Sequence, residues 1–225
     1  MNEHVGLMTT LASQGSSVLE LGVPWPSLPR GATSSWAFLS ALAMNKTSHS
    51  STPLLIQVDI HNCFRVRFDQ MAQMHGVEMK YFWQDDLSLD LQTIGRSSEE
   101  GGILEHGVDL VFIDTFHVYG QLKRELIKYA PIAKCYIVLH DTTVDGEYSE
   151  VIRMGVSISE LERNEISLSP LLVNRPGWHQ DELITGLWKA VEEFLSVSKE
   201  WKLVHRYTNN NGLTVLERTC CWNTP

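Results

Sequence analysis

The chain has 225 residues, a net charge of −9 and a sequence pI near 5.4. This balance argues against a protein that grips a phosphate backbone, because such binding needs a concentrated surplus of Lys and Arg. The length fits one domain, residues 1–225, with a single substantial core. The first ten residues lack a basic segment followed by an apolar run, and no apolar stretch approaches the ~20 residues that span a bilayer. We therefore expect a cytoplasmic protein that binds a small molecule and neither nucleic acid nor a membrane.

The four cysteines show no pattern that predicts a metal site. Cys63 and Cys135 each lie in an apolar or helical stretch, where a free Cys usually behaves as a small buried hydrophobe. Cys220 and Cys221 are adjacent near the C-terminus and lack the spacing of metal ligands. These positions predict reduced cysteines, as in an intracellular protein.

Five apolar runs, each closed by an acid or a polar pair, predict strands; they cover 17–23, 54–59, 79–84, 108–114 and 135–139. Helical spacing is expected over 36–42, 64–75, 121–129 and 184–196, the first behind a cap at Ser34 and Ser35. A polar helix with a glycine-rich segment, 95–102, should follow the third run. Alternating strands and helices predict a mostly parallel sheet covered on both faces, with right-handed crossovers.

The last third of the chain is less regular. Residues 142–182 are polar and irregular, and we predict a substrate-side insertion over the site there. Trp178 and His179 in this segment would either stack on a sugar face or, as we favour, anchor the loop. Two strand-like segments, 201–207 and 212–216, flank an Asn-Asn-Asn-Gly run, which favours a hairpin because Asn and Gly tolerate positive φ.

Acidic residues recur where the predicted strands end: Glu20, Asp59, Asp86, Asp114 and Asp141. In an open parallel sheet, ligands bind beyond the carboxyl ends of the strands, at the point where the strand order reverses. Taken singly, each acid is more readily interpreted as a helix cap or a solvated strand end. Their recurrence at one edge of the sheet favours a binding site.

Asp59 and the first loop indicate the kind of ligand. An Asp after the second strand can accept hydrogen bonds from both hydroxyls of a ribose, which indicates an adenosine-type ligand. A dinucleotide site would need a G-x-G-x-x-G turn, whereas Gly22 is followed by Val-Pro-Trp-Pro. The carboxylate of Glu20 would repel a phosphate, yet it suits the amino group and sulfonium of S-adenosylmethionine. The residues therefore favour S-adenosylmethionine over NAD.

From Val18 to about Glu217 the chain resembles the class I S-adenosylmethionine-dependent methyltransferases. The resemblance implies a Rossmann-like, doubly wound, mostly parallel seven-stranded sheet with a C-terminal antiparallel hairpin. Segments 109–119 and 136–142 are similar to one branch in particular, which holds small sugar O-methyltransferases and cephalosporin-hydroxylase-like proteins. In that branch, acids that end the fourth and fifth strands hold a divalent metal, usually magnesium, which chelates neighbouring hydroxyls of the acceptor.

This resemblance implies roles for individual residues. Asp114 and Asp141 match metal-ligand positions; without a metal, they would line the pocket and cap a turn. His140 matches the first member of the metal-binding pair, and because hard cations prefer oxygen, we favour a hydrogen-bonding role beside the ligands over coordination. His117 matches a histidine near the base position, whereas Phe116 stands where some sugar methyltransferases have an acidic base. The base is then His117 or a water.

The first loop departs from the short glycine-rich turn of the family, because residues 24–30 look inserted. Ser34 and Ser35 become the candidates for holding the methionine carboxylate. The predicted cofactor-binding set is Glu20, Gly22, Ser34, Ser35, Asp59, Asp86 and Asp114. The catalytic set is His117, Asp114 and Asp141, and the metal set is Asp114, Asp141 and His140.

The expected function is methyl transfer from S-adenosylmethionine to a hydroxyl of a sugar, a glycan or another small polar metabolite, assisted by Mg²⁺ or another divalent cation. One alternative is an NAD-dependent oxidoreductase on a similar sheet. Another is a non-catalytic binding module that has the same fold. The oligomeric state is left open, with a homo-oligomer among the options.

Overall fold

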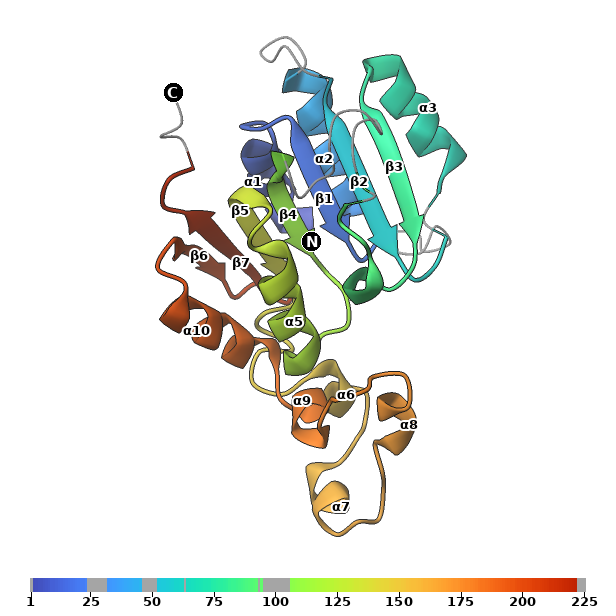
Figure 1. Ribbon diagram of the computed structural model, residues 1–225, viewed down its shortest axis with the longest axis vertical. Coiled ribbons are helices and arrows are strands. Elements are labelled where there is room, and N and C mark those ends of the chain that lie inside the picture. Colours follow the sequence, from blue (N-terminus) through green and yellow to red (C-terminus); the bar gives the residue numbers. More distant parts are fainter. Residues whose placement is uncertain are drawn as a thin grey trace.

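The computed structural model describes residues 2–23, 32–45, 52–62, 64–92, 94 and 106–221. These residues form a seven-stranded sheet in the order β3-β2-β1-β4-β5-β7-β6 (Figure 1). Strands β1 to β5 are parallel, and β7 runs antiparallel between β5 and β6. The doubly wound fold with a C-terminal antiparallel hairpin is therefore confirmed. The strands are β1 (Ser17–Leu21), β2 (Leu54–Asp59), β3 (Glu78–Trp83), β4 (Val108–Ile113), β5 (Ala133–His140), β6 (Trp201–Tyr207) and β7 (Leu213–Arg218).

Helices cover both faces of the sheet, which is why the central strands are apolar at nearly every position. Helices α5 (Tyr119–Tyr129) and α10 (Leu187–Val197) lie in front of the sheet in Figure 1, and α1 (Val5–Ala12) and α2 (Thr33–Asn45) lie behind it. The core on the α2 side also includes Phe68 from α3 (Val66–His75). Short 3-10 turns occupy Asn2–His4 (η1) and Asp86–Ser88 (η2).

Two helix starts differ from the sequence interpretation. Helix α1 was not predicted, because it is short and weakly amphipathic and its first turn carries no side-chain cap. Ser34 and Ser35 do not cap α2; they lie inside its first turn, because the helix begins at Thr33 and both hydroxyls donate to a buried carboxylate. Of the polar helix expected after β3, only η2 lies within the described residues, and segment 95–102 lies outside them.

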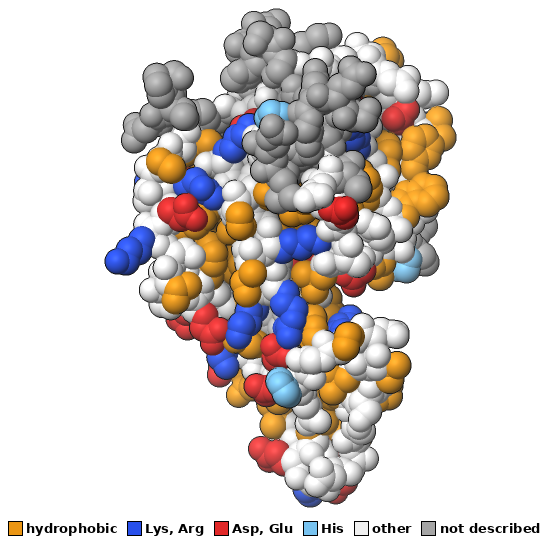
Figure 2. Space-filling view, viewed as in Figure 1, with side chains coloured by type: hydrophobic (Ala, Val, Ile, Leu, Met, Phe, Trp, Pro, Cys, Tyr) orange, Lys and Arg blue, Asp and Glu red, His pale blue; other side chains and the backbone are white. Residues whose placement is uncertain are grey.

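The segment for which an insertion was predicted folds into short helices at one end of the sheet. They are α6 (Glu150–Arg153), α7 (Ile158–Glu162), α8 (Ser169–Leu172) and α9 (Gln180–Ile184). We call residues 150–184 the cap. A small core of its own, which includes Val151, Leu161 and Leu183, packs against Val118. In Figure 2 the surface narrows from the sheet to the cap.

The C-terminal hairpin turns where the sequence predicts it. Asn210, Asn211 and Gly212 have φ values of 49°, 71° and 98°, in the left-handed region that Asn and Gly tolerate. Among the described residues, no helix combines the length and the apolar character needed to cross a membrane.

The prediction that Cys135 is a free thiol is wrong, because Cys135 forms a disulfide with Cys221. Tyr136 pairs with Glu217 in the antiparallel ladder, so the chain that leaves β7 passes the start of β5. The ladder thereby brings together two cysteines that lie 86 residues apart in sequence. Cys220 is exposed and free, and Cys63 lies outside the described residues.

Candidate active site

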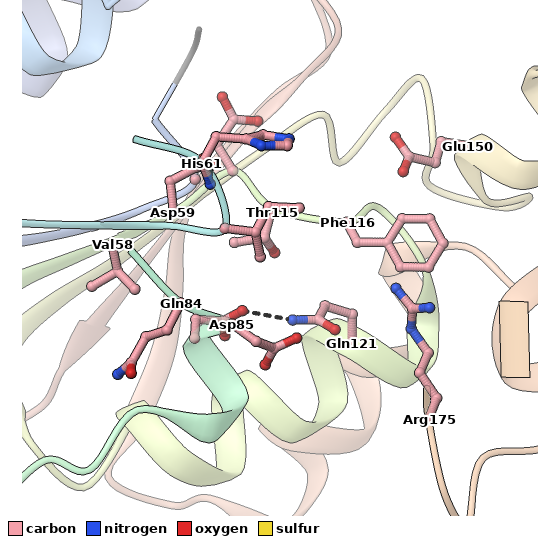
Figure 3. A pocket seen from close by; sticks show the side chains of 14 residues that line it. Val58, Asp59, His61, Gln84, Asp85, Thr115, Phe116, Gln121, Glu150 and Arg175 are labelled. Carbon is pink, nitrogen blue, oxygen red and sulfur yellow. Dashed lines mark hydrogen bonds between the residues drawn. The ribbon is translucent and has the colours of Figure 1, made fainter. Parts of the chain in front are cut away.

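A cavity of about 370 Å³ opens beyond the carboxyl ends of β1 to β4 (Figure 3). It lies at the point where the strand order reverses, between β1 and β4, which is where sheets of this kind bind ligands. Of the predicted site residues, Gly22, Asp59, Asp86 and Asp114 line the cavity, whereas Glu20, Ser34, Ser35, His117, His140 and Asp141 do not. The full lining is Gly22, Val58, Asp59, Ile60, His61, Gln84, Asp85, Asp86, Asp114, Thr115, Phe116, Gln121, Glu150 and Arg175.

Gly22 brings the ends of β1 and β4 into direct contact. Its φ is +78°, and a Cβ on this residue would lie only 1.9 Å from the carbonyl oxygen of Asp114. The amide of Asp114 donates to the carbonyl of Leu21 at 2.9 Å, which continues the pairing of the two strands. Any side chain at position 22 would therefore displace the backbone that carries Asp114.

Asp59 is held at the end of β2 by two backbone amides. Its Oδ2 accepts from Val23 N at 2.9 Å and its Oδ1 accepts from His61 N at 2.7 Å. These bonds fix the plane of the carboxylate, and each oxygen keeps a free lone pair for a further donor. The geometry suits a ligand with two adjacent hydroxyls.

Glu20 belongs to a polar network beneath the cavity and not to its lining. Its carboxylate is fully buried and accepts from Ser34 Oγ at 2.6 Å, from Ser35 Oγ at 2.8 Å and from Gln57 Nε2 at 2.6 Å. Burial raises the pKa of Glu20. A buried carboxylate needs such partners, so in this structure Ser34 and Ser35 serve the carboxylate of Glu20. The sequence interpretation missed Gln57. The signal that could have revealed it is a single amide side chain within the apolar strand 54–59.

Asp86 is a buried carboxylate of the lining that belongs to a network with Gln121 and Glu125. Its Oδ1 accepts from Gln121 Nε2 at 2.9 Å, and the same amide group donates to Glu125 Oε1 at 2.9 Å. Thr115 Oγ1 also donates to Glu125, at 2.5 Å. Burial raises the pKa of Asp86 to about 6, and burial together with the charge of Asp86 holds the pKa of Glu125 well above its usual range. Asp86 Oδ2 is buried and has no hydrogen-bond partner among the described residues.

His117 lies at the centre of a cluster of carboxylates next to the cavity. Its Nε2 is 3.1 Å from Asp114 Oδ1, and its Nδ1 is 3.1 Å from Asp145 Oδ2, 3.2 Å from Asp141 Oδ2 and 3.4 Å from Glu150 Oε2. Burial opposes a charge on the ring, but the hydrogen bonds to Asp114 and Asp145 and the nearby negative charges outweigh it. The pKa of His117 is consequently held well above 6.5.

His140 and Asp141 lie behind Asp114 at the end of β5. Burial opposes a charge on His140, but its contacts with Asp114 and Asp141 raise its pKa to about 9. The hydrogen bonds from His117 and His140 outweigh burial at Asp114 and hold its pKa well below the usual range. Asp141 has a φ of 58°, a backbone conformation that non-glycine residues rarely adopt and that often marks functional sites.

Two overlapping sets of side chains have the spacing of a cation site. One ligand atom each from Asp114, His140 and Asp141 lies within 4.8 Å of the others, and the same holds for His117, Asp141 and Asp145. Two buried atoms in these sets, His140 Nε2 and Asp141 Oδ1, form no hydrogen bond with any described residue. Asp141 Oδ1 lies 2.7 Å from His140 Nδ1, but the two groups are not aligned for a hydrogen bond. Unsatisfied buried polar atoms are costly, so the donor set fits a divalent cation that takes carboxylate oxygens.

Asp145 and Glu150 are site residues that the sequence interpretation missed. Both follow Asp141 within ten residues, in a segment assigned only as an irregular insertion. Asp145 is fully buried and paired with Arg153, whose Nε lies 2.7 Å from its Oδ1. Acids at 141, 145 and 150 followed by Arg153 are the signal that could have indicated a charged cluster.

The outer wall of the cavity comes from the cap. The guanidinium of Arg175 lies 4.7 Å from the ring centre of Phe116 and 5.4 Å from that of Trp178. The ring centre of Trp178 also lies 4.3 Å from the guanidinium carbon of Arg124. The same ring lies close to Gly120 at the start of α5, where a side chain would clash with it. Through these contacts Trp178 anchors the cap on α5. The backbone amide of the neighbouring His179 donates to the carboxylate of Glu182 at 3.0 Å.

No family model matches this chain, and no curated protein shows significant sequence similarity to it. Solved structures do match. The O-methyltransferase of Bacillus cereus, in complex with S-adenosylhomocysteine, superposes with a TM-score of 0.50 at 12% identity over 97% of this chain and 82% of that chain. The S-adenosylhomocysteine-bound methyltransferase PaMTH1 of Podospora anserina gives 0.49 at 10% identity over 96% and 78%.

A third match is MycE, a methyltransferase of mycinamycin biosynthesis solved with Mg and S-adenosylhomocysteine. It gives a TM-score of 0.47 at 14% identity over 96% of this chain and 48% of that chain. The strand order and the superposition on the Bacillus cereus structure establish that this chain has the class I methyltransferase fold. A fold of this kind does not determine the activity, which depends on the residues of the site.

Proposed function

We propose that this protein is an S-adenosylmethionine-dependent O-methyltransferase that acts on a hydroxyl of a sugar or another small polar metabolite, with a divalent cation held by Asp114 and Asp141. The observation that carries the proposal is the double role of Asp114. Asp114 lines the cavity at the end of β4, and its carboxylate is at the same time within hydrogen-bond distance of His117. The binding cavity and the group able to accept a proton therefore meet at one residue.

The lining of the cavity suits the methyl donor. When bound, S-adenosylmethionine supplies its methyl group from a sulfonium, and the acids at the ends of β2, β3 and β4 favour a cation in this cavity. Asp59 offers two carboxylate oxygens to the ribose hydroxyls, and Asp86 Oδ2 offers a buried acceptor for an amino group. The Bacillus cereus structure of the same fold holds S-adenosylhomocysteine, which is consistent with this assignment.

His117 is the proposed base. The acceptor hydroxyl has to lose its proton as its oxygen attacks the methyl carbon. The hydrogen bond between Nδ1 and Asp145 keeps one proton on that nitrogen, which leaves Nε2, on the side of Asp114, to take the proton of the acceptor. The surrounding carboxylates favour the protonated ring. A divalent cation held by Asp114 and Asp141 would offset the negative charge that favours a second proton on the ring, and His117 would then be able to act as a base.

The donor set around Asp141 fits such a cation. Asp114 and Asp141 would hold it through carboxylate oxygens, and His140 would orient Asp114 through its Nδ1, 3.2 Å from Asp114 Oδ1. When bound, the cation would lower the pKa of an acceptor hydroxyl and fix its position. Two carboxylates beside the cavity, with oxygens as ligands, favour a hard cation such as Mg²⁺ over a softer metal.

Calorimetry and turnover test the proposal. We expect S-adenosylmethionine to bind and NAD not to bind, and methyl transfer to sugar acceptors to fall when a chelator removes divalent cations. Asp141→Ala should lower kcat by about 100-fold or more and abolish the response to Mg²⁺. Asp181→Ala, which removes an exposed carboxylate from the cap, is the control and should behave as wild type.

Three outcomes would contradict the proposal in different ways. Binding of NAD without S-adenosylmethionine would favour an oxidoreductase. Binding of S-adenosylmethionine without methyl transfer to any acceptor would favour a binding module. Unchanged Mg²⁺ dependence in Asp141→Ala would show that the metal lies elsewhere.

A further inference from the structure

Arg175 differs from the other arginines near the cap because it has no acidic partner among the described residues. Arg153 pairs with Asp145, Arg163 pairs with Glu165, and Arg124 pairs with Glu182. Arg175 lines the cavity, and its one hydrogen bond within the described part of the chain runs from NH1 to the carbonyl of Leu171 at 2.9 Å. A permanently charged side chain thus borders the cavity with most of its donors unused.

The way in which Arg175 is held leaves those donors available to a ligand. The rings of Phe116 and Trp178 contact the guanidinium, at 4.7 Å and 5.4 Å from their centres. A guanidinium held over aromatic rings is attracted by their π faces, a contact that needs no hydrogen-bond acceptor and so leaves the N–H groups available. Of five N–H donors, the bond to Leu171 engages one. The remaining edge matches the two oxygens of a carboxylate or phosphate.

The position of Arg175 places this donor edge at the acceptor end of the cavity. In Figure 3, Val58, Asp59, Gln84 and Asp85 lie together at one end, whereas Arg175 extends toward Phe116 at the other. Glu150, also at that end, contacts His117 at 3.4 Å. A group bound to Arg175 would therefore lie on the side of the proposed base and away from the ribose-binding acids.

We propose that the acceptor carries an anionic group, a carboxylate or a phosphate, which Arg175 binds through the free edge of its guanidinium. The substrate class is then an acidic sugar or a similar hydroxy acid or phosphate ester. The assignment of this ligand as the methyl acceptor rests on the proposed function, whereas the binding of an anion at Arg175 does not. The cation of Arg175 also offsets the repulsion that the acidic cavity would otherwise exert on such a substrate.

Calorimetric titrations with three small sugars test this inference. The probes are glucuronate, which carries a carboxylate, glucose 6-phosphate, which carries a phosphate, and glucose, which is neutral. Each is titrated into the full-length protein with Mg²⁺, with and without saturating S-adenosylhomocysteine. We expect at least one of the acidic sugars to bind about 10-fold or more tighter than glucose, because a hydrogen bond to a charged group contributes that much. Whichever acidic sugar binds more tightly shows whether the anionic group is a carboxylate or a phosphate.

Variants show whether Arg175 is responsible. Arg175→Gln keeps a planar group over Phe116 but removes the charge, and it should bring the affinity for the acidic sugar down to that for glucose. Arg175→Lys keeps the charge without the two-pronged edge and should give an intermediate affinity. The matched control is Arg163→Gln, which removes the same charge from an exposed ion pair elsewhere in the cap. It should leave every affinity unchanged.

Equal affinities of wild type for all three sugars, or no measurable binding of either acid at millimolar concentration, would overturn the inference. Unchanged affinity in Arg175→Gln would also overturn it. A failure to bind S-adenosylhomocysteine would count against the proposed function alone, because the sugar titrations without it still report on Arg175. Thermal unfolding of each variant shows whether a lost affinity reflects a lost fold.

Discussion

Glu125 is buried next to the cavity, and its neighbour in the network is a second carboxyl group, that of Asp86. Two adjacent carboxylates cannot both ionise cheaply, so one proton is retained between them at neutral pH. The pKa of Glu125 is raised in the folded protein, which means that the folded state holds a proton that the unfolded state releases above about pH 4.3. The free energy of unfolding must then fall as the pH rises above that value.

The substitution Glu125→Gln tests whether Glu125 causes this fall in the free energy of unfolding. The amide can still accept from Thr115 and Gln121 and can donate to Asp86, but it does not titrate. We expect the variant to match wild type at pH 4 and to be more stable than wild type at pH 8, by on the order of 1 kcal/mol. Urea unfolding at the two pH values measures the difference. The exposed Glu147→Gln serves as the control, and a variant less stable than wild type at pH 8 would contradict the argument.

At the scale of single residues, the sequence predicted the acids better than their partners. Asp59 and Asp114 line the cavity as expected, because the end of a parallel strand is a local feature that an apolar run announces. Asp145 and Arg175 come from an irregular segment whose path depends on tertiary packing, so no local pattern places them near the site. Ser34 and Ser35 were expected to bind the methionine carboxylate of the cofactor. The sequence did not reveal that their hydroxyls donate to the buried carboxylate of Glu20.

At the scale of elements, the contact between the ends of β1 and β4 determines where Asp114 lies. The two strands are adjacent in the sheet although β2 and β3 separate them in the sequence, and their ends touch at Gly22. The absence of a side chain at position 22 allows that contact. The positive φ of Gly22 and its short distance to Asp114 should each make a substitution destabilising, and the two effects can be separated by experiment.

Gly22→Ala should destabilise the protein and weaken the binding of S-adenosylhomocysteine, because it displaces the backbone of Asp114. Gly177→Ala is the matched control, since Gly177 has the same φ of +78°, but a Cβ on it would meet no atom within 4 Å. The control should cost about 1–2 kcal/mol from backbone strain, and Gly22→Ala should cost at least about 2 kcal/mol more. Denaturant unfolding and calorimetry check both effects. Equal costs in the two variants would show that the close approach to Asp114 is relieved without penalty.

The disulfide between Cys135 and Cys221 ties the end of the chain to β5. Cys135→Ser should lower the free energy of unfolding by about 2–4 kcal/mol, since it releases a long loop in the unfolded state. Cys220→Ser, at an exposed free cysteine, should have little effect. In denaturant without reductant, no more than two of the four cysteines should react with a thiol reagent. Four reactive thiols in protein purified without reductant would contradict the disulfide.

Strands were predicted more closely than helices, and the reason is physical. Strands buried on both faces give continuous apolar runs, so β2 has the predicted bounds. β6 lies at the edge of the sheet and is mostly exposed, but its bounds were also predicted, because the Asn-rich turn marks where it ends. Helices α1 and α2 are weakly amphipathic or apolar all round, and α1 has no side-chain cap that marks its start. The cysteine pairing could not be predicted, because it depends on which strand lies next to β5.

At the scale of the whole molecule, the cavity draws its lining from both halves of the sheet and from the cap. A ligand that fills it therefore contacts the folded arrangement and has no counterpart in the unfolded chain. Binding should stabilise the protein as a whole, in proportion to the logarithm of the ligand concentration.

S-adenosylhomocysteine at 100 times its dissociation constant should add about 2.7 kcal/mol to the free energy of unfolding. For a domain of this size, that corresponds to a rise in Tm of about 5–10 °C. Differential scanning calorimetry measures the rise, with NAD at the same concentration as the control. A shift with NAD and none with S-adenosylhomocysteine would exclude the proposed donor.

The order of the strands also governs how the protein is made. β1 lies in the middle of the sheet, but its neighbour β4 is synthesised only after β2 and β3, and β5 gains its neighbour β7 only after β6 has been made. During synthesis an apolar strand edge on β1 therefore stays open for many residues, and later one on β5 does so too. Such open edges invite mispairing and slow the search for native contacts. We expect nascent chains of this protein to depend on chaperones until the C-terminal hairpin has left the ribosome.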